Sequence, residues 1–131
     1  MTSEYMLLVR NSDLERRVAA EPLKKAMDDL IAWVERLARE GIVKAAQPLE
    51  PMGRVLTMTG KTIADGPFTE TKEAIGGFFW ITASSLEEAV EIAKTHPLLE
   101  FDIELEVRPV VDMCPSMRLV GLEHGAVLVT P

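Results

Sequence analysis

Two amphipathic helical patterns, set among short strand-like segments, restrict the fold of this 131-residue chain more than any other feature of its sequence. Apolar residues recur every three or four positions from residue 23 to residue 38, with charged residues between them. This spacing is typical of a helix that packs one face on a hydrophobic core. Gly41 follows the run at the position where helices most easily end, so the first helix is predicted to stop just before it.

The second helix is marked by a start signal and a stop signal. Ser85 and Glu88 have the spacing of a capping box, in which the serine accepts from the N3 amide and the glutamate reaches back to the cap amide. The helix is therefore predicted to begin at Leu86. Pro97 ends it one or two residues earlier, because the residue before a proline avoids helical geometry.

Short runs of strand-favouring residues surround both helices. In the last run, apolar residues at 103, 105 and 107 alternate with charged ones, as expected of a strand with two unlike faces. Asp65, Gly66 and Pro67 are dense in turn formers and are expected to end strand pairing. The predicted strands are residues 5–9, 42–46, 55–59, 77–82 and 103–107, with an excursion at residues 60–75.

The order strand, helix, strand, strand, helix, strand predicts an α+β fold of the ferredoxin-like βαββαβ type. Two helices can cover only one face of such a sheet, and self-association is the simplest cover for the other, so we expect a homodimer. After residue 111, residues 118–122 and 126–129 are apolar enough to pair as a hairpin. An arm exchanged with a partner is the alternative for this C-terminal extension, residues 112–131.

Charge and cysteine content exclude several kinds of partner. Twenty-one Asp and Glu against 14 Lys and Arg give a net charge of −7, which opposes binding to nucleic acid or an anionic membrane surface. The single cysteine, Cys114, excludes an internal disulfide and suits a reducing compartment. No segment has the roughly 20 apolar residues of a membrane span or the features of a signal peptide. We expect a cytoplasmic protein, and two widely separated histidines offer no metal-ligand spacing or cofactor motif.

The middle of the chain carries a specific motif. Residues 65–73 read DGPFTETKE, Gly76-Gly77-Phe78 follow, and Val107-Arg108-Pro109-Val110 come later. Over residues 4–111, the chain resembles the DGPF group of the YCII-related proteins, and residues 1–111 are taken as this domain. The resemblance implies a dimeric ferredoxin-like assembly of the α/β-barrel type, in which two sheets face one another around a small pocket. It also implies enzymes on small aromatic compounds among the relatives, and genes often placed beside extracytoplasmic-function sigma factors.

The resemblance does not transfer the acid/base pair of the founding YCII subgroup. That pair is a histidine on the first helix and an aspartate in an Asp-Pro step after the second helix. Here no histidine lies between Pro22 and Gly41, and the step after the second helix is His96-Pro97. His96 is therefore the group that could supply the titrating side chain from the other side.

His96 and Asp65 are the candidate catalytic residues. The ordinary pKa of histidine, about 6.5, allows His96 to exchange protons near neutrality. The alternative is an exposed histidine that is favoured at a helix C-terminus by the helix dipole. Asp65 is a candidate carboxylate on a rigid turn, and the alternative is an aspartate that caps the turn's own amides.

Four further residues are candidate ligand contacts: Phe68, Glu70, Lys72 and Arg108. Phe68 could wall a pocket or simply pack in a core or dimer interface. Glu70 and Lys72 belong to a charged run that is usually a solvated loop, and the resemblance raises the odds of ligand binding or bracing of the dimer. Arg108 lines a dimer pocket if the polar face of its strand looks inward, and is otherwise solvated.

Two functions from different classes fit these features. The first is a dimeric small-molecule-binding protein or small enzyme that uses general acid/base chemistry on a small organic substrate, with aromatic compounds as the class that the resemblance suggests. The second is a non-catalytic regulatory or interaction module associated with an extracytoplasmic-function sigma factor. The sequence favours the first slightly and does not decide whether the chain is an enzyme, because a fold alone does not fix a function.

Overall fold

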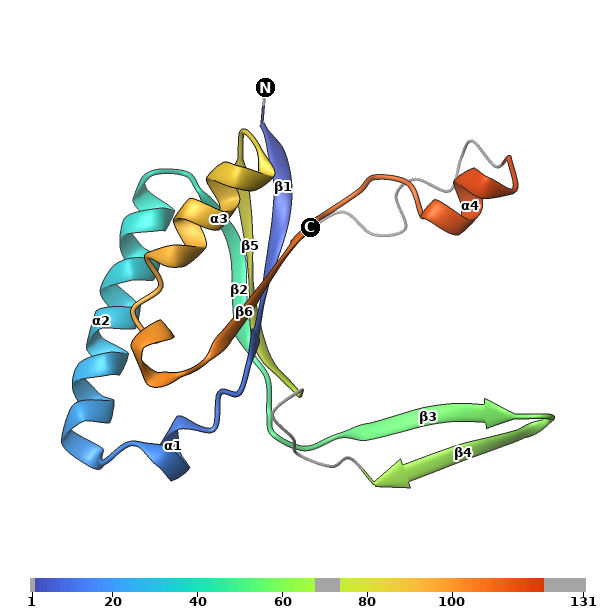
Figure 1. Cartoon of the computed structure of the whole chain (residues 1–131), viewed down its shortest axis with the longest axis horizontal. Helices are drawn as coiled ribbons and strands as arrows, with labels where there is room; N and C mark the ends of the chain where they lie inside the picture. The colour runs from blue at the N-terminus through green and yellow to red at the C-terminus, as the bar shows by residue number, and fades with distance from the viewer. Residues whose placement is uncertain (1, 68–73, 122–131) are drawn as a thin grey trace.

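A four-stranded antiparallel sheet forms the body of the protein in the computed structural model, which describes residues 2–67 and 74–121. Its strand order is β2-β5-β1-β6, with every neighbouring pair antiparallel (Figure 1). The strands are β1 (Ser3–Arg10), β2 (Val43–Pro48), β5 (Ile75–Ala83) and β6 (Glu104–Pro109). The two central strands, β5 and β1, are therefore distant in sequence, and they pair from end to end with one register shift between Val9 and Arg10.

Two helices lie on the same face of this sheet, α2 (Ala20–Arg39) and α3 (Leu86–Lys94) (Figure 1). With the sheet strands they follow the βαββαβ order predicted from the sequence, so the α+β fold is confirmed. Two short helical turns flank them, α1 (Leu14–Arg17) and η1 (Leu99–Phe101). Gly41 has a φ of +74° just after α2, as expected of a helix-ending glycine.

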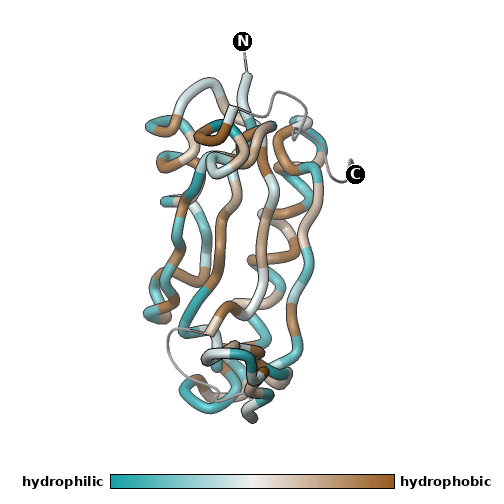
Figure 2. Tube along the Cα trace, turned by 90° about the vertical axis from the view of Figure 1, so that its right-hand side faces the viewer, coloured by the Kyte–Doolittle hydropathy of each residue, from teal (hydrophilic) through white to brown (hydrophobic). Residues whose placement is uncertain are grey.

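The core lies between the helices and the sheet. Along β1, buried residues alternate with half-buried ones, so that Tyr5, Leu7 and Val9 face the helices. Figure 2 shows hydrophobic stretches running along the strands and helices of this body. The fully buried side chains of greatest volume are Leu7, Leu37 and Ile81, which come from β1, α2 and β5.

The start of α3 differs in one detail from the predicted capping box. The Ser85 hydroxyl accepts a hydrogen bond from the Glu88 amide at 3.1 Å, as predicted. The Glu88 carboxylate, however, accepts from the amide and hydroxyl of Ser84, at 3.1 and 2.7 Å, and not from the Ser85 amide. Glu88 therefore binds Ser84, the residue before the cap, and not the cap residue itself. The helix ends at Lys94, one or two residues before the predicted end at Thr95 or His96.

A second, two-stranded sheet projects from the body as a hairpin (Figure 1). It consists of β3 (Arg54–Thr59) and β4 (Thr62–Pro67), with Gly60 in the turn at a φ of +62°. The prediction that Asp65, Gly66 and Pro67 end the pairing is wrong, since they pair with Leu56, Val55 and Arg54. A strand that pairs on one side only tolerates a proline, because the missing amide need not complete a ladder.

The tail also departs from its predicted form. Residues 115–119 form a short helix, α4 (Pro115–Leu119), where Arg118 and Leu119 were predicted to begin a strand. Pro115 stands in the first turn, a position that proline favours, and the Arg118 amide donates to the Cys114 carbonyl at 3.0 Å. The second predicted strand, residues 126–129, lies outside the described residues.

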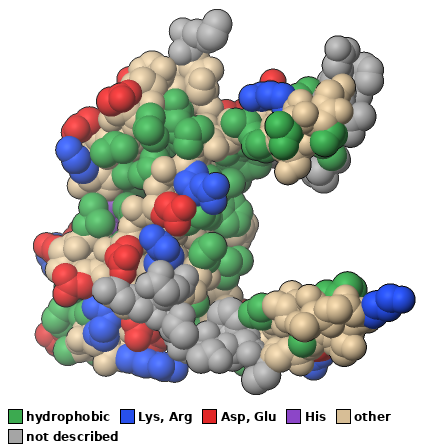
Figure 3. All heavy atoms as spheres, turned by 45° about the vertical axis from the view of Figure 1, so that its right-hand side comes forward, with side chains coloured by type: hydrophobic (Ala, Val, Ile, Leu, Met, Phe, Trp, Pro, Cys, Tyr) green, Lys and Arg blue, Asp and Glu red, His purple; other side chains and the backbone are tan. Residues whose placement is uncertain are grey.

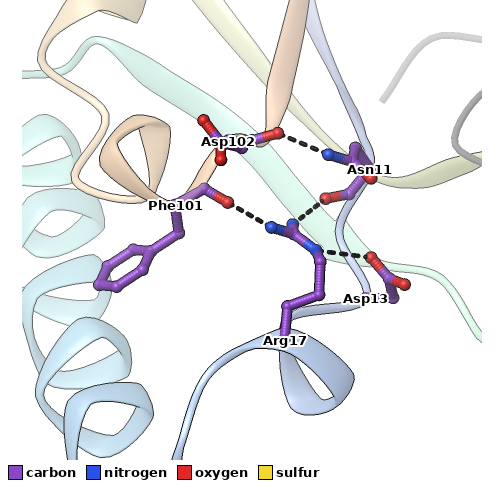
Figure 4. Close-up of polar contacts among 5 residues, drawn as sticks. All are labelled: Asn11, Asp13, Arg17, Phe101 and Asp102. Carbon is purple, nitrogen blue, oxygen red and sulfur yellow. Dashed lines mark hydrogen bonds and ion pairs between the residues drawn. The ribbon is translucent and has the colours of Figure 1, made fainter.

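A clamp centred on Arg17 joins two connections that are far apart in sequence (Figure 4). Its guanidinium donates to the Asn11 carbonyl and the Phe101 carbonyl at 2.7 Å each, and to the Asp13 carboxylate at 3.0 Å. The Asn11 side chain donates to the Asp102 carbonyl at 2.6 Å. The clamp joins the segment that follows β1 to the segment that precedes β6. It thereby fixes the position of the chain on both sides of Ser12.

Candidate functional site

A cavity of about 480 Å³ lies between α2 and the part of the sheet formed by β2 and β5. Most of its lining side chains are apolar, including Met27, Leu30 and Val34 from α2. The polar lining residues are Ser12, Glu35, Gln47 and His96. A concave, mostly apolar space with a few polar groups is the usual form of a small-molecule site.

Two adjacent glycines shape the sheet side of this cavity. A Cβ added at Gly77 would lie 2.9 Å from the Gln47 carbonyl oxygen, which is backbone of the neighbouring strand. A Cβ at Gly76 would collide with the Ser12 hydroxyl. Neither glycine has a positive φ, so close approach, rather than backbone conformation, requires them. Sequence reasoning missed this role, although two consecutive glycines opening a strand were a usable signal.

His96 is buried at the cavity, with 3% of its surface exposed. Its ring packs against two aromatic rings that also contact each other: the His96 centroid lies 4.8 Å from that of Trp33 and 5.4 Å from that of Phe79, and the Trp33 and Phe79 centroids are 5.3 Å apart. The Leu98 amide donates a hydrogen bond to Nδ1 at 3.1 Å. Burial lowers the pKa of His96 to about 4, so the imidazole is neutral at pH 7. The alternative of an exposed histidine at the helix end is therefore wrong.

Asp65 lies elsewhere. It stands in β4 on the projecting hairpin, where its carboxylate pairs with the Arg54 guanidinium at 3.1 Å. Asp65 is not among the residues that line the His96 cavity, so a single chain does not bring the two candidate catalytic residues together. Three candidate ligand contacts, Phe68, Glu70 and Lys72, lie outside the described residues.

Residues 3–114 match the family of the YCII-related domain. The chain belongs to the YCII-related family. A relative of this chain is an uncharacterized protein of Rhizobium meliloti (strain 1021), which is 36% identical over 75 residues. That match spans 54% of this chain and 60% of the relative.

This YCII-related chain has an aromatic residue where α2 meets His96. The Trp33 indole packs on the imidazole and donates from Nε1 to the Thr95 hydroxyl at 2.8 Å. Thr95 donates in turn to the Ile92 carbonyl at 2.6 Å. Trp33 thus holds the end of α3 against α2. A histidine and aspartate pair of the founding YCII kind is not formed between α2 and the His96-Pro97 step.

The other face of the sheet carries a mixture of apolar and charged side chains. On β1 and β5 the half-buried residues Met6, Leu8, Phe78 and Trp80 lie opposite the helix-facing ones, with Met6 beside Trp80 and Leu8 beside Phe78. We call these four residues the open sheet face. Figure 3 shows hydrophobic groups next to acidic and basic ones on the body, with two projecting segments above and below a hollow.

Charged residues border the open sheet face on both sides. Glu4 accepts from Lys44 at 2.8 Å and from the Trp80 indole at 2.9 Å, and the Lys44 hydrogen bond lowers the pKa of Glu4. On β6, Glu106 pairs with Arg10 at 3.6 Å and with Arg108 at 3.7 Å. Arg108 is exposed on this polar side of β6, while Leu105 and Val107 pack against the core.

The described residues show neither a metal-ligand cluster nor a membrane-spanning helix. Within residues 2–67 and 74–121, no three histidine, cysteine, aspartate or glutamate residues gather as metal ligands would. No helix in the same part of the chain is long and apolar enough to cross a membrane. Cys114 is exposed, and hydrogen bonds from the Met117 and Ser116 amides lower the pKa of its thiol, a shift that the sequence did not indicate.

Proposed function

We propose that this YCII-related chain binds a small organic molecule in the cavity beside His96, as a homodimer of the DGPF group. The single observation that carries the proposal is an apolar cavity of about 480 Å³ with one buried imidazole in its lining. Small-molecule sites commonly measure about 300 to 1,000 Å³ and combine apolar walls with a few polar groups. The DGPF assignment rests on the residues 65–78 quoted above.

The proposed chemistry is general acid/base catalysis on a small organic substrate, with aromatic compounds as the candidate class, and its main support is His96. A titratable group in a cleft with a strongly shifted pKa is a recognised mark of a functional site. Asp65 has weaker support, because its carboxylate is already paired with Arg54 and lies away from the cavity. Among the described residues, the His96 side chain is hydrogen-bonded to the Leu98 amide and to no carboxylate.

The proposed dimer forms through the open sheet face. The helices cover the opposite face only, and Met6, Leu8, Phe78 and Trp80 are each only half-buried within one chain. Covering them with a second copy would remove apolar surface from water, while the bordering ion pairs would form a polar rim. Sedimentation equilibrium is expected to show a dimer, and Leu8→Lys is expected to shift it to monomer. A monomeric wild-type chain would contradict this part.

Ligand binding is tested by thermal shift with a broad library of small organic molecules. A ligand at 100 times its Kd stabilises a protein by about 2.7 kcal/mol, which is readily visible. Ile31 is exposed at the cavity lining, and Ile31→Trp is expected to obstruct the cavity and abolish the shifts. Ile63→Trp is the matched control, since Ile63 is similarly exposed on the hairpin. No shift with any compound, or equal shifts in both variants, would contradict the proposal.

An interaction module is the second candidate, and the hairpin favours it. Four large apolar residues, Val55, Leu56, Met58 and Ile63, are more than half exposed there. A two-stranded hairpin is marginally stable in water without packing, so a protein partner such as an extracytoplasmic-function sigma factor would stabilise it. The test is co-elution of the chain with that sigma factor at physiological salt, with Leu56→Lys expected to prevent it. Separate elution of the wild-type chain would contradict this function.

A further inference from the structure

His96 presents one kind of hydrogen-bonding group to the cavity. The Leu98 amide nitrogen lies 3.1 Å from Nδ1, and a backbone amide can only donate. Nδ1 must therefore be the acceptor, and a neutral imidazole in this position carries its proton on Nε2. The contact spans two residues of the chain, so the local His96-Pro97-Leu98 turn itself selects the tautomer.

The ring has little freedom to present its other edge. Trp33 and Phe79 pack against it, with centroids 4.8 and 5.4 Å away. Turning the ring over would break the Leu98 hydrogen bond and leave a buried amide without an acceptor, which is unfavourable. Nε2 makes no hydrogen bond with a described residue, and His96 lines the cavity, so the Nε2 proton is available to a ligand.

The rest of the cavity repels negative charge. None of its lining residues is a lysine or arginine, and its one charged lining residue is acidic, Glu35. Burial also lowers the pKa of the imidazole to about 4, so the ring is neutral at pH 7 and adds no positive charge. A carboxylate or phosphate entering here would lose water without gaining a cation. An uncharged hydrogen-bond acceptor, such as a carbonyl group, loses much less hydration free energy on entering the cavity.

We infer that His96 meets the ligand as a fixed hydrogen-bond donor through Nε2, and that the cavity takes neutral, largely apolar molecules bearing a carbonyl-type acceptor. The inference rests on the proposed function and defines the ligand class of the same cavity. It also restricts the acid/base role, because a nitrogen that already holds a proton cannot remove one from a substrate. His96 then polarises a carbonyl by donation, while Nδ1 remains bonded to Leu98.

The first test reads the tautomer of the wild-type protein directly. Long-range ¹H–¹⁵N correlation of the imidazole at pH 7 is expected to show the Nε2-protonated neutral form for His96. An Nδ1-protonated form, or an imidazolium, would overturn the inference. This measurement needs no variant, and it does not depend on whether any ligand has been found.

The second test compares three probes of similar shape by titration calorimetry. Methyl 2-naphthoate has a neutral acceptor, 2-naphthoate is an anion, and 2-ethylnaphthalene has no acceptor. We expect the ester to bind most tightly, the hydrocarbon several-fold more weakly, and the anion weakest. One neutral hydrogen bond contributes about 0.5 to 1.5 kcal/mol, which is roughly 2- to 12-fold in Kd.

The variant His96→Phe separates donation from shape. It keeps an aromatic ring against Trp33 and Phe79 but removes the donor, so it is expected to weaken binding of the ester to the level of the hydrocarbon and to leave binding of the hydrocarbon unchanged. If 2-naphthoate binds as tightly as its ester, the donor inference is overturned while the cavity function stands. If none of the probes binds, and library screening also fails, the proposed function fails and the inference with it.

Discussion

Acid should weaken this fold through a single buried side chain. His96 is 3% exposed, and burial lowers its pKa from 6.5 to about 4 in the folded protein. In the unfolded chain the same group binds a proton near pH 6.5. As the pH falls from 6.5 toward 4, protons therefore stabilise only the unfolded state. The stability that this group contributes is complete above pH 6.5 and is lost on acidification, with little further change below the folded pKa.

The size of the effect follows from the two pKa values. One pKa unit corresponds to about 1.4 kcal/mol, so lowering the pKa from 6.5 to about 4 removes about 3 kcal/mol of stability between pH 7 and pH 4. This is a large share of the roughly 5 to 15 kcal/mol typical of a folded domain. Carboxyl groups whose pKa is lowered by hydrogen bonds, such as Glu4 and Glu88, add further acid sensitivity.

The assay is urea unfolding at pH 7, 6, 5 and 4, followed by tryptophan fluorescence at one protein concentration. His96→Phe removes the titrating group, so its stability should fall about 3 kcal/mol less than that of the wild type over this range. Ile81→Val is the control, since it should cost about 1 kcal/mol equally at every pH. Parallel pH profiles for the wild type and His96→Phe would refute the reasoning.

Three further substitutions test how the site is positioned. Gly77→Ala should destabilise the protein by about 1 to 3 kcal/mol in thermal unfolding, because its Cβ would press on the Gln47 carbonyl, whereas Gly66→Ala, with open space around it, should not. Arg17→Lys should cost about 1 to 2 kcal/mol in urea unfolding, because an ammonium cannot bridge two carbonyls and a carboxylate in the same plane. Ser85→Ala should cost about 1 kcal/mol in the same assay through loss of the helix cap, and an unchanged midpoint would refute the capping role.

The elements that the sequence predicted well are those set by local patterns. The 3.6-residue period of α2, the glycine that ends it and the serine that caps α3 all act within a few residues, and each was found where predicted. The wrong prediction at residues 65–67 also rested on a local pattern. Asp-Gly-Pro favours a turn locally, but pairing with residues 54–56 of β3 supplies hydrogen bonds that hold the segment extended.

The site was harder to predict because its properties depend on distant neighbours. A histidine next to a helix end and a proline gives no sign of its own burial. It is Trp33, 63 positions earlier, and Phe79 on β5 that enclose His96. The stronger motif, around Asp65, drew attention to a residue that the structure places on the hairpin, bonded to Arg54. The motif around Asp65 therefore identified the family but not His96, which lines the cavity.

The cavity lies on the helix side of the sheet, and three residues of the open sheet face, Met6, Leu8 and Trp80, are not among its lining residues, whereas Phe78 is. Adjacent residues of a strand point to opposite faces. On β5, Phe79 faces the helices and packs on His96, while Trp80 faces the other way and pairs with Glu4. A substitution at Trp80 should therefore change self-association and leave ligand binding in the cavity unaltered. A substitution at Phe79, which lines the cavity, should change ligand binding and leave self-association unaltered. If each substitution changes self-association and ligand binding together, the dimer interface and the ligand cavity are coupled through the sheet. A partner chain would then act on the cavity as an effector.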